Sequence, residues 1–184
     1  MKSYDYAHRQ GVEEISWERF AELSALLSEK LAQAGVEVIL GIARAGLFPA
    51  AAAAAALRCE LFPVRVTRRL KDRVIYTHPV WKVDVPDEIA GKVTAVVDEI
   101  ADSGETLALV ADRARQRGAR QVLSAALVTH SWAKPFPEAY ALQTDALVIF
   151  PWDRQVLIDG RWQPHPEIVE ALRLQDRGTH GAQP

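Results

Sequence analysis

The 184-residue chain is long enough for one sizeable domain, and its apolar fraction of 49% and charged fraction of 25% are typical of globular proteins. A net charge of −2 gives no general attraction to nucleic acid or to an acidic membrane surface, so any anion must be bound locally. The single cysteine, Cys59, excludes an internal disulfide, and the first residues lack the apolar core of a secretory signal, so we expect a cytoplasmic protein.

The first predicted element is an amphipathic helix that begins after Ser16, a suitable N-cap, and ends near Gly35. Its apolar residues recur at helical spacing: Phe20, Leu23, Leu27 and Leu31. Residues 36–42 form a short β-branched run that predicts a strand, and residues 45–57 predict an alanine-rich helix. Pro49 suits the first turn of that helix, which is too short to cross a bilayer and is expected to be buried.

Residues 60–69 predict a second strand, and the polar and aromatic segment after it has no helical period, so we expect a hairpin or a mobile loop over residues 65–90. From Lys92 the pattern returns to strand, loop and helix, and residues 121–130 predict the next strand. The apolar face of the helix comprises Leu107, Val110, Ala111 and Ala114. This alternation predicts an α/β fold with a central, mainly parallel sheet flanked by helices, whereas the polar residues 175–184 predict a disordered tail.

The stretch "VVDEIADSGETL", residues 96–107, is predicted at the edge of the sheet where strands end and helices begin, and where ligands usually bind. The helix start presents backbone N–H groups, to which Ser103 and Thr106 add hydroxyls, and Gly104 lets the backbone approach a ligand closely. These groups predict a phosphate cradle. It is not a Walker loop, because that pattern and its lysine are absent.

Asp98 and Glu99 would repel a bare phosphate, so they are expected to face something else. A carboxylate pair accepts hydrogen bonds from vicinal hydroxyls and supports Mg²⁺, which prefers oxygen ligands. A phosphate on one side and a diol on the other describe a ribose 5-phosphate. On spacing alone, the alternative is a solvated loop with a good N-cap, because helix caps are far commoner than phosphate sites.

The same residues closely resemble the phosphoribosyl pyrophosphate motif of type I phosphoribosyltransferases: hydrophobic residues, two acidic residues, two spacers, then Asp, Ser or Thr, Gly, any residue and Thr. The resemblance implies that Asp98 and Glu99 hold the ribose hydroxyls. It implies that the 5-phosphate is bound by Ala101, Asp102, Ser103, Gly104, Glu105 and Thr106. In the 6-oxopurine branch, the aspartate that opens the loop, here Asp102, also lies near N7 of the base and handles its proton, which makes it a catalytic residue.

A second stretch, "GIARAGLFPA" at residues 41–50, resembles the pyrophosphate loop of the family, which often contains a cis peptide. Arg44 and Gly46 match that loop, whereas Ala45 replaces a common glycine and adds a methyl group to the turn. The basic residues that open the later excursion are Arg65, Arg68, Arg69, Lys71 and Arg73. The family has a closing loop there, so Arg68 and Arg69 are expected at the pyrophosphate. The residues alone also fit a tight strand-to-helix turn and a basic, solvated hairpin.

A third stretch, "SWAKPFPEAY" followed by "ALVIFPWDR", resembles the bacterial xanthine-guanine enzymes in order and spacing. The resemblance implies that Lys134 reads the purine O6 and that Asp153 is a candidate partner for a second Mg²⁺ or for pyrophosphate. The base-stacking position carries Leu147, with Val148 beside it, instead of an aromatic ring, although Phe150 or Trp152 could supply one. Lys134 also fits a solvated strand end. None of the five histidines has metal-ligand spacing to another, and none is assigned a role.

The resemblance implies a single phosphoribosyltransferase domain with a Rossmann-like core. The expected regions are a helical segment at 1–35, a core at 36–135, a small C-terminal hood at 136–170 and the tail at 175–184. The implied reaction is transfer of a phosphoribosyl group from phosphoribosyl pyrophosphate to a nucleobase, a 6-oxopurine first, with Mg²⁺ as cofactor. Two alternatives stay open: a pyrimidine as the base, and a phosphoribosyl-pyrophosphate-sensing regulator. The family is commonly dimeric, and no nucleic-acid or membrane partner is expected.

Overall fold

The structure, a computed structural model, describes residues 9, 11–67, 69–70, 73–74 and 79–180. The chain divides into two compact units, and each is described by itself. Unit 1 comprises residues 1–21 and 144–184, and unit 2 comprises residues 22–143. The predicted hood at 136–170 differs from this division, because residues 136–143 belong to unit 2.

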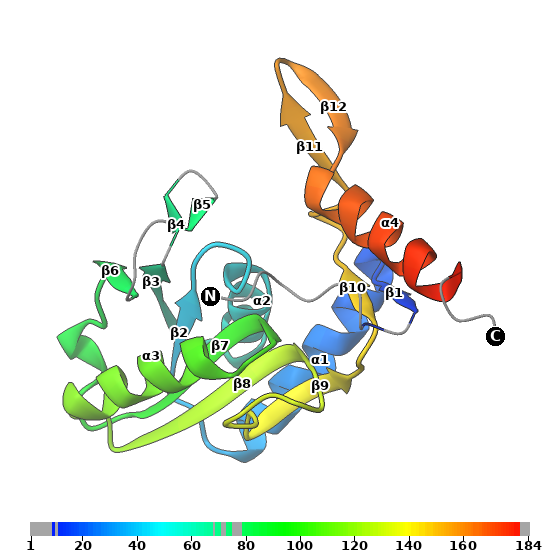
Figure 1. Ribbon diagram of the computed structural model, residues 1–184. Coiled ribbons are helices and arrows are strands. Elements are labelled where there is room, and N and C mark those ends of the chain that lie inside the picture. The colour runs from blue at the N-terminus through cyan, green and yellow to red at the C-terminus, as the bar shows by residue number, and fades with distance from the viewer. Residues whose placement is uncertain (1–8, 10, 68, 71–72, 75–78, 181–184) are drawn as a thin grey trace. The chain divides into compact units, whose positions relative to one another are not determined.

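A six-stranded sheet forms the centre of unit 2 (Figure 1). In spatial order its strands are β6 (Val80–Val83), β3 (Glu60–Thr67), β2 (Val38–Ile42), β7 (Val93–Ala101), β8 (Gln121–Thr129) and β9 (Ala139–Gln143). All pairings among the last five of these strands are parallel, whereas β6 pairs antiparallel with β3 at the edge of the sheet. The mainly parallel α/β sheet predicted from the sequence is therefore confirmed.

Helices α2 (Leu47–Leu57) and α3 (Glu105–Gln116) cover opposite faces of this sheet. A Cβ atom on Gly41 of β2 would lie 2.8 Å from the Cβ of Ala50, so α2 packs on the face that Gly41 presents. The next residue back along β2, Leu40, points to the other face and shares a core cluster with α3. The buried residues of α3 are those predicted: Leu107, Val110, Ala111 and Ala114.

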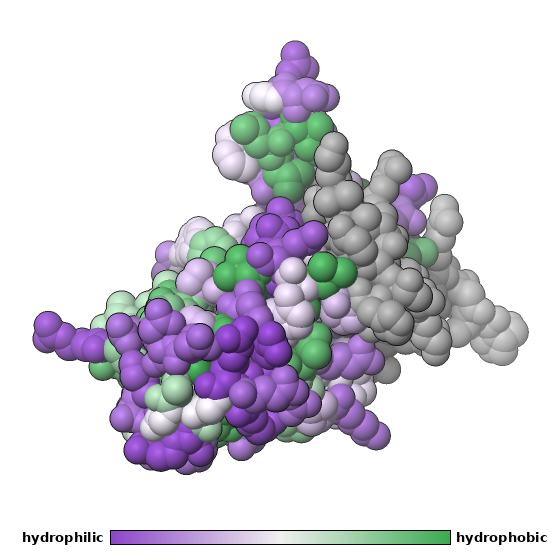
Figure 2. Space-filling view, turned by 90° about the vertical axis from the view of Figure 1, so that its left-hand side faces the viewer, coloured by the Kyte–Doolittle hydropathy of each residue, from purple (hydrophilic) through white to green (hydrophobic). Residues whose placement is uncertain are grey.

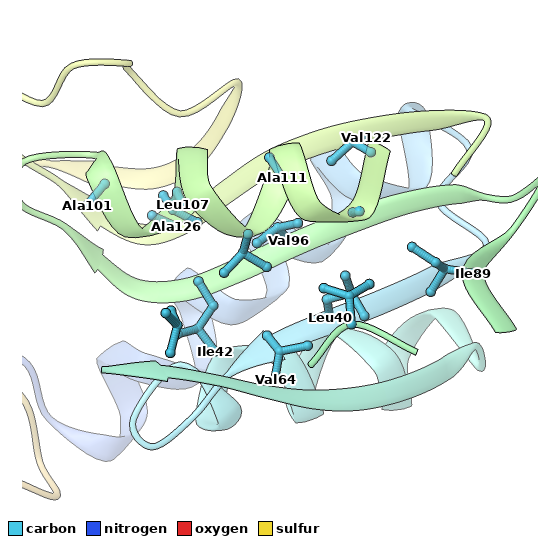
Figure 3. Packing of buried hydrophobic residues seen from close by; sticks show 14 of the residues in the cluster. Leu40, Ile42, Val64, Ile89, Val96, Ala101, Leu107, Ala111, Val122 and Ala126 are labelled. Atoms are coloured by element: carbon cyan, nitrogen blue, oxygen red, sulfur yellow. The ribbon is translucent and has the colours of Figure 1, made fainter. Parts of the chain in front are cut away.

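The main core of unit 2 lies between α3 and the sheet (Figure 3). The strands contribute Val38, Leu40, Ile42, Val64, Val66, Val96, Val122 and Ala126. Full burial of each large aliphatic side chain stabilises the fold by about 1.5–3 kcal/mol. Because these residues lock neighbouring strands to one helix, the carboxyl ends of the strands, and the loops that follow them, are held in fixed register.

Helix α1 (Trp17–Gln33) begins in unit 1 and ends in unit 2, and both of its predicted ends are confirmed. The Ser16 Oγ accepts a hydrogen bond from the Arg19 N–H at 3.1 Å, which caps the first turn. After the last turn, Gly35 has φ = +68°, a left-handed conformation that glycine adopts without a Cβ clash. Towards its end, α1 is tied to β9 by a hydrogen bond from the Lys30 Nζ to the Tyr140 carbonyl.

The predicted hairpin or loop over residues 65–90 contains two antiparallel pairings. Strand β6 returns along β3, and the short strands β4 (Arg69–Leu70) and β5 (Arg73–Val74) pair with each other. The 3-10 helix η2 (Asp87–Ile89) leads into β7. Residues 68, 71–72 and 75–78 of the predicted mobile loop lie outside the described residues.

A carboxylate between two arginines fastens the end of that segment to α3. Asp84 accepts a bidentate hydrogen bond from Arg113 and a further one from Arg117, whose Nη2 lies 2.7 Å from Oδ2. The Arg117 Nη1 also contacts Asp87 at 2.6 Å. Hydrogen bonding by Arg113 and Arg117 holds the pKa of Asp84 well below its usual range, against the opposing effect of burial.

Unit 1 contains two small sheets and one helix. Strand β1 (Val12–Glu14), which the sequence did not predict, pairs parallel with β10 (Leu147–Ile149), and β11 (Gln155–Ile158) pairs antiparallel with β12 (Arg161–Pro164). A small core forms where β10 meets helix α4 (Pro166–His180), and it comprises Leu147, Ile149, Ile168 and Ala171. An aromatic group of unit 1 comprises Trp17, Phe20, Phe150 and Trp152.

Two features of unit 1 depart from simple expectation. Helix α4 extends over residues 175–180, which the sequence analysis placed in a disordered tail, because Ile168 and Ala171 anchor it to β10. Hydrophobic side chains also gather on the hairpin of β11 and β12, uppermost in Figure 2. There Leu157, 59% exposed, pairs across the strands with Trp162, 68% exposed.

Among the helices of the described residues, none has the length and apolar character needed to cross a membrane.

Candidate active site

Three loops of unit 2 meet at the carboxyl edge of the sheet, because β2, β7 and β8 are adjacent and parallel. They are residues 43–46 after β2, residues 102–104 after β7 and residues 130–138 after β8. Gly46 of the first loop lies against Asp98, near the end of β7. The second and third loops are joined by a 2.8 Å hydrogen bond from the Lys134 N–H to the Ser103 carbonyl. The candidate residues of unit 2 thus lie in one place.

The acidic pair lies at the end of β7, and both side chains are half-buried. The Glu99 N–H donates to the Asp98 Oδ1 at 3.0 Å. Burial raises the pKa of Asp98 well above its usual range, and the adjacent Glu99 carboxylate raises it further. Two carboxylates this close repel each other, so the pair is complementary to a ligand that supplies hydroxyl donors or a cation.

The predicted phosphate loop connects β7 to α3. Ser103, Glu105 and Thr106 are exposed to solvent, as a cradle for a ligand requires. Gly104, the N-cap of α3, has φ = +82°, so the chain turns there in a conformation that favours glycine. The Ser103 Oγ accepts the Glu105 N–H at 3.3 Å, so the loop is ordered by its own hydroxyl. The start of α3 faces the edge with its positive dipole end, which favours an anion.

The predicted pyrophosphate loop connects β2 to α2. The Ala43–Arg44 peptide bond is cis, and the Arg44 side chain is exposed. Ala45 is not among the positive-φ residues, so the backbone there accommodates its methyl group. Gly46 is buried, and the turn that leads into α2 is closed by a hydrogen bond from the Leu47 N–H to the Arg44 carbonyl at 3.2 Å.

The two arginines predicted at the pyrophosphate are not placed by the structure. Arg68 lies outside the described residues, and only the backbone of Arg69, in β4, is described. Their assignment stays a prediction.

Lys134 lies beside the phosphate loop, with its side chain exposed and its peptide bond to Pro135 cis. Besides the hydrogen bond to Ser103, the backbone here packs tightly on Gly104, where a Cβ atom would lie 3.0 Å from the Lys134 carbonyl carbon. The lysine predicted to read the base is therefore fixed relative to the predicted phosphate site through main-chain contacts.

Two residues that the sequence analysis did not assign lie at the same place. The His130 ring is fully buried, and its Nε2 is 3.8 Å from the Asp102 Oδ1. The Trp132 Nε1–H donates to the same oxygen at 3.3 Å, and the two rings stack with centroids 4.4 Å apart. Their position directly after an apolar parallel strand was the available signal, because ligand sites gather at such strand ends.

The remaining predicted site residues belong to unit 1. Leu147 is 4% exposed within the core against α4, and Val148 beside it is half-buried. Phe150 is 4% exposed and stacks on Trp152 with ring centroids 4.8 Å apart, so both rings take part in the packing of unit 1. Asp153 lies in the turn after β10, where its N–H donates to the Phe150 carbonyl.

The acidic pair suits a Mg²⁺ ion that is also bound by waters and substrate phosphates. Among the described residues, no group of three or more His, Cys, Asp and Glu side chains is arranged to hold a metal ion. Mg²⁺ does not need such a cage, because it is usually bound by one or two carboxylates together with waters and substrate phosphates. Asp98 and Glu99 fit that role.

The chain matches the model of one protein family. The profile of the phosphoribosyl transferase domain family matches residues 11–158, which include the acidic pair, the phosphate loop and Lys134. No curated protein sequence is significantly similar to the chain.

Solved structures similar to this one include a purine phosphoribosyltransferase from Pyrococcus horikoshii Ot3, with a TM-score of 0.70 and 26% identity over 80% of this chain and 98% of that one. A hypothetical protein from Neisseria gonorrhoeae with bound ppGpp has a TM-score of 0.66 and 22% identity over 93% and 99%. A xanthine-guanine-hypoxanthine phosphoribosyltransferase from Helicobacter pylori has a TM-score of 0.63 and 17% identity over 88% and 99%. The last two show the fold alone.

Proposed function

The chain belongs to the phosphoribosyl transferase domain family, and from that premise we propose that it transfers the 5-phosphoribosyl group of phosphoribosyl pyrophosphate to a 6-oxopurine. The enzyme is a phosphoribosyltransferase, and the identity of the base is the proposed part. Pyrophosphate is the other product, and the reaction would recover a free base as a nucleotide.

One observation carries the proposal: the Lys134 N–H donates to the Ser103 carbonyl at 2.8 Å. This bond joins the loop expected to read the base to the loop expected to hold the 5-phosphate. Because the same phosphate loop follows directly from the acidic pair, groups suited to a base, a ribose and a phosphate lie on one continuous surface of unit 2. A helix cap without a ligand would not require that arrangement.

The chain's own residues would act mainly by position and charge. Asp98 and Glu99 bind the ribose hydroxyls, the loop at 102–106 binds the 5-phosphate, and Arg44 supports the departing pyrophosphate. When N9 of the base attacks C1′, the bond from C1′ to the pyrophosphate oxygen breaks and its electron pair leaves with the pyrophosphate. Asp102 accepts the proton that the base loses at N7. Preorganised charges of this kind commonly supply the largest share of catalysis.

Mg²⁺ is the proposed cofactor, and Asp98 and Glu99 would hold it. Asp153 of unit 1 stays a separate proposal, as a partner for a second Mg²⁺ or for pyrophosphate. When bound, it neutralises charge on the pyrophosphate and thereby makes it a better leaving group.

Two observations support a 6-oxopurine. Lys134 has an exposed ammonium group, which donates hydrogen bonds only and so suits an oxygen at C6 rather than an amino group. The similar Pyrococcus protein, at 26% identity, is named a purine phosphoribosyltransferase. Leu147 and Val148 stay the residues proposed to pack against the face of the base.

The test combines the protein with phosphoribosyl pyrophosphate, Mg²⁺ and a panel of hypoxanthine, guanine, xanthine, adenine, uracil and orotate, and follows pyrophosphate release. We expect turnover with at least one 6-oxopurine. Lys134→Met should reduce kcat/KM for that base by roughly 10²-fold, the size expected for the loss of a hydrogen bond from a charged group, while any adenine activity changes little. Turnover confined to pyrimidines would contradict the choice of base, and none with any base would contradict the reaction.

A regulatory role is a second candidate, because the Neisseria protein of the same fold was solved with bound ppGpp. We propose testing ppGpp in the same assay. Competition with phosphoribosyl pyrophosphate in an active enzyme indicates a regulated enzyme, whereas ppGpp binding without turnover on any base favours a sensor.

A homodimer in the cytoplasm is also proposed. The outer face of α2 exposes Phe48, 40% accessible, together with Ala51, Ala55 and Ala56, and small apolar residues allow close helix packing. Light scattering after size exclusion tests the dimer, and Phe48→Glu should favour the monomer.

A further inference from the structure

We propose that His130 and Trp132 are positioning residues that hold the Asp102 carboxylate in place to accept the proton of the base. The inference rests on the proposed function, and it assigns a role to two residues that the motif of the family does not contain. Neither residue is proposed to touch the substrate, so both would act through Asp102.

Two contacts with Asp102 converge on a single oxygen. The Trp132 Nε1–H donates to Oδ1 at 3.3 Å, and the His130 Nε2 approaches the same atom to 3.8 Å. A carboxylate at the start of a glycine-containing loop is free to rotate about two side-chain bonds unless something fixes it. Contacts from two rings to one oxygen limit that rotation and give Asp102 a defined orientation.

The two rings also support each other. They stack at 4.4 Å with an interplanar angle of 17°. In this stack, the His130 ring is fully buried, whereas Trp132 is 43% exposed to solvent. The buried His130 ring supports the exposed Trp132 ring. This packing fixes the direction of the indole N–H toward Asp102.

The backbone of His130 is itself fixed to the strand that ends in Asp102's loop. The His130 N–H donates to the Ala101 carbonyl at 3.2 Å, and the His130 carbonyl accepts the Ala133 N–H at 3.2 Å and the Thr129 hydroxyl at 3.3 Å. Ala101 directly precedes Asp102. Main-chain and side-chain contacts therefore both hold the loop that begins at Asp102 against the loop that begins at His130. Such supporting contacts keep a reacting group within the small tolerance that catalysis needs.

If His130 and Trp132 only filled space, removal of the Trp132 N–H would not change kcat. Kinetics therefore distinguish a positioning role from a purely structural one. Trp132→Phe keeps an aromatic ring on His130 but removes the N–H. We expect kcat to fall roughly 10-fold, a part of the 10²–10⁴-fold effect of a general base, while the KM for phosphoribosyl pyrophosphate stays within about 2-fold. Trp162→Phe, the same change at an exposed tryptophan of unit 1, is the matched control and should leave kcat unchanged.

His130 is examined with two replacements, because a buried site tolerates change poorly. Glutamine places an amide nitrogen near the original Nε2, whereas leucine does not. We expect His130→Gln to retain more kcat than His130→Leu. Calorimetric binding of phosphoribosyl pyrophosphate to each variant shows that the fold and the acidic pair are intact. Equal kcat for glutamine and leucine, with binding retained, would refute the role of the nitrogen.

A double-mutant cycle tests whether the effect passes through Asp102. In an Asp102→Asn background, followed by single-turnover kinetics, Trp132→Phe should cause no further loss. An equal loss in both backgrounds, or wild-type kcat in Trp132→Phe, overturns the positioning role while the enzyme stays active on the base. Absence of turnover in the wild-type protein instead overturns the proposed function, so the two failures are distinct.

Discussion

Gly46 and Asp98 approach so closely that a Cβ atom on Gly46 would lie 2.6 Å from the Asp98 Oδ1. The same atom would lie 2.6 Å from the carbonyl oxygen of Ile42, which is backbone and cannot rotate away. The loop after β2 and the end of β7 are therefore packed against each other. The predicted pyrophosphate loop and the predicted ribose-binding pair are in direct contact.

Gly46→Ala should destabilise the protein and weaken the binding of phosphoribosyl pyrophosphate. Inserting a methyl group into a packed site costs roughly 1–3 kcal/mol, which for a chain of this size lowers Tm by about 2–4 °C per kcal/mol. Thermal unfolding and calorimetric titration measure the two effects. Ala45→Gly changes the same turn in the opposite sense and should alter stability by less than about 1 kcal/mol. A Gly46→Ala protein as stable as the wild type would show that the two loops separate easily.

Asp98→Asn should increase stability and abolish transfer. The substitution removes a half-buried charge that lies beside Glu99, while the amide oxygen still accepts the Glu99 N–H. We expect Tm near pH 7, in the absence of ligand and Mg²⁺, to rise by a few degrees, and turnover to fall below detection. Such opposed effects are typical of a site whose charges serve function at a cost in stability. A fall in both Tm and activity would instead indicate a structural role for Asp98.

Asp84→Asn should destabilise the protein in a pH-dependent way. The folded-state pKa of Asp84 lies below the unfolded value of about 4, so its contribution is complete above pH 4 and is lost as the pH falls through the lowered pKa. The side chain is 34% exposed, and screening limits the expected effect to about 1 kcal/mol.

Thermal unfolding of wild type and Asp84→Asn between pH 7 and pH 3 measures this difference. The gap in Tm should be about 2–4 °C at pH 7 and should narrow below pH 4. Asp112→Asn is the control, because Asp112 is 67% exposed and makes an ion pair with Arg115 on the same helix. It should change Tm by less than 1 °C or so. A gap that stays constant with pH would contradict the role of the ionised carboxylate.

Gly104→Ala and Gly118→Ala separate backbone strain from steric overlap. The two glycines have nearly equal φ values, +82° and +84°. A Cβ on Gly118 would be 3.7 Å from Ala90, an ordinary contact, whereas one on Gly104 would overlap the Pro135 carbonyl oxygen. We expect Gly118→Ala to cost about 1–2 kcal/mol from strain alone.

Gly104→Ala should lose at least a further 1 kcal/mol or so, because the loop that carries Lys134 must move. Affinity for phosphoribosyl pyrophosphate should fall only in Gly104→Ala. Urea unfolding and calorimetry distinguish the two variants. Equal stability and equal affinity would show that the contact between Gly104 and Pro135 has no consequence for the site.

Much of the fold could be predicted from local pattern. The capping of α1 by Ser16, the buried face of α3 and the parallel order of strand and helix follow from periodicity, cap residues and glycine positions, which act over a few residues. The strand β1 escaped prediction because it is short and its partner, β10, lies more than a hundred residues further along the chain. The helical residues 175–180 were missed because they continue a helix whose earlier residues, Ile168 and Ala171, pack against β10.

The candidate site divides in the same manner. The sequence by itself determined which residues were predicted for the site: the acidic pair and the phosphate loop follow from one short motif, and Lys134 follows from the resemblance to the family. Only the tertiary structure decided that Lys134 is bonded to Ser103, that Gly46 touches Asp98, and that His130 and Trp132 converge on Asp102. These contacts join residues from different strand ends, which parallel pairing brings together across long separations. The spacing of residues in the sequence does not indicate which loops come into contact. The contacts that support the site are therefore seen only in the folded chain.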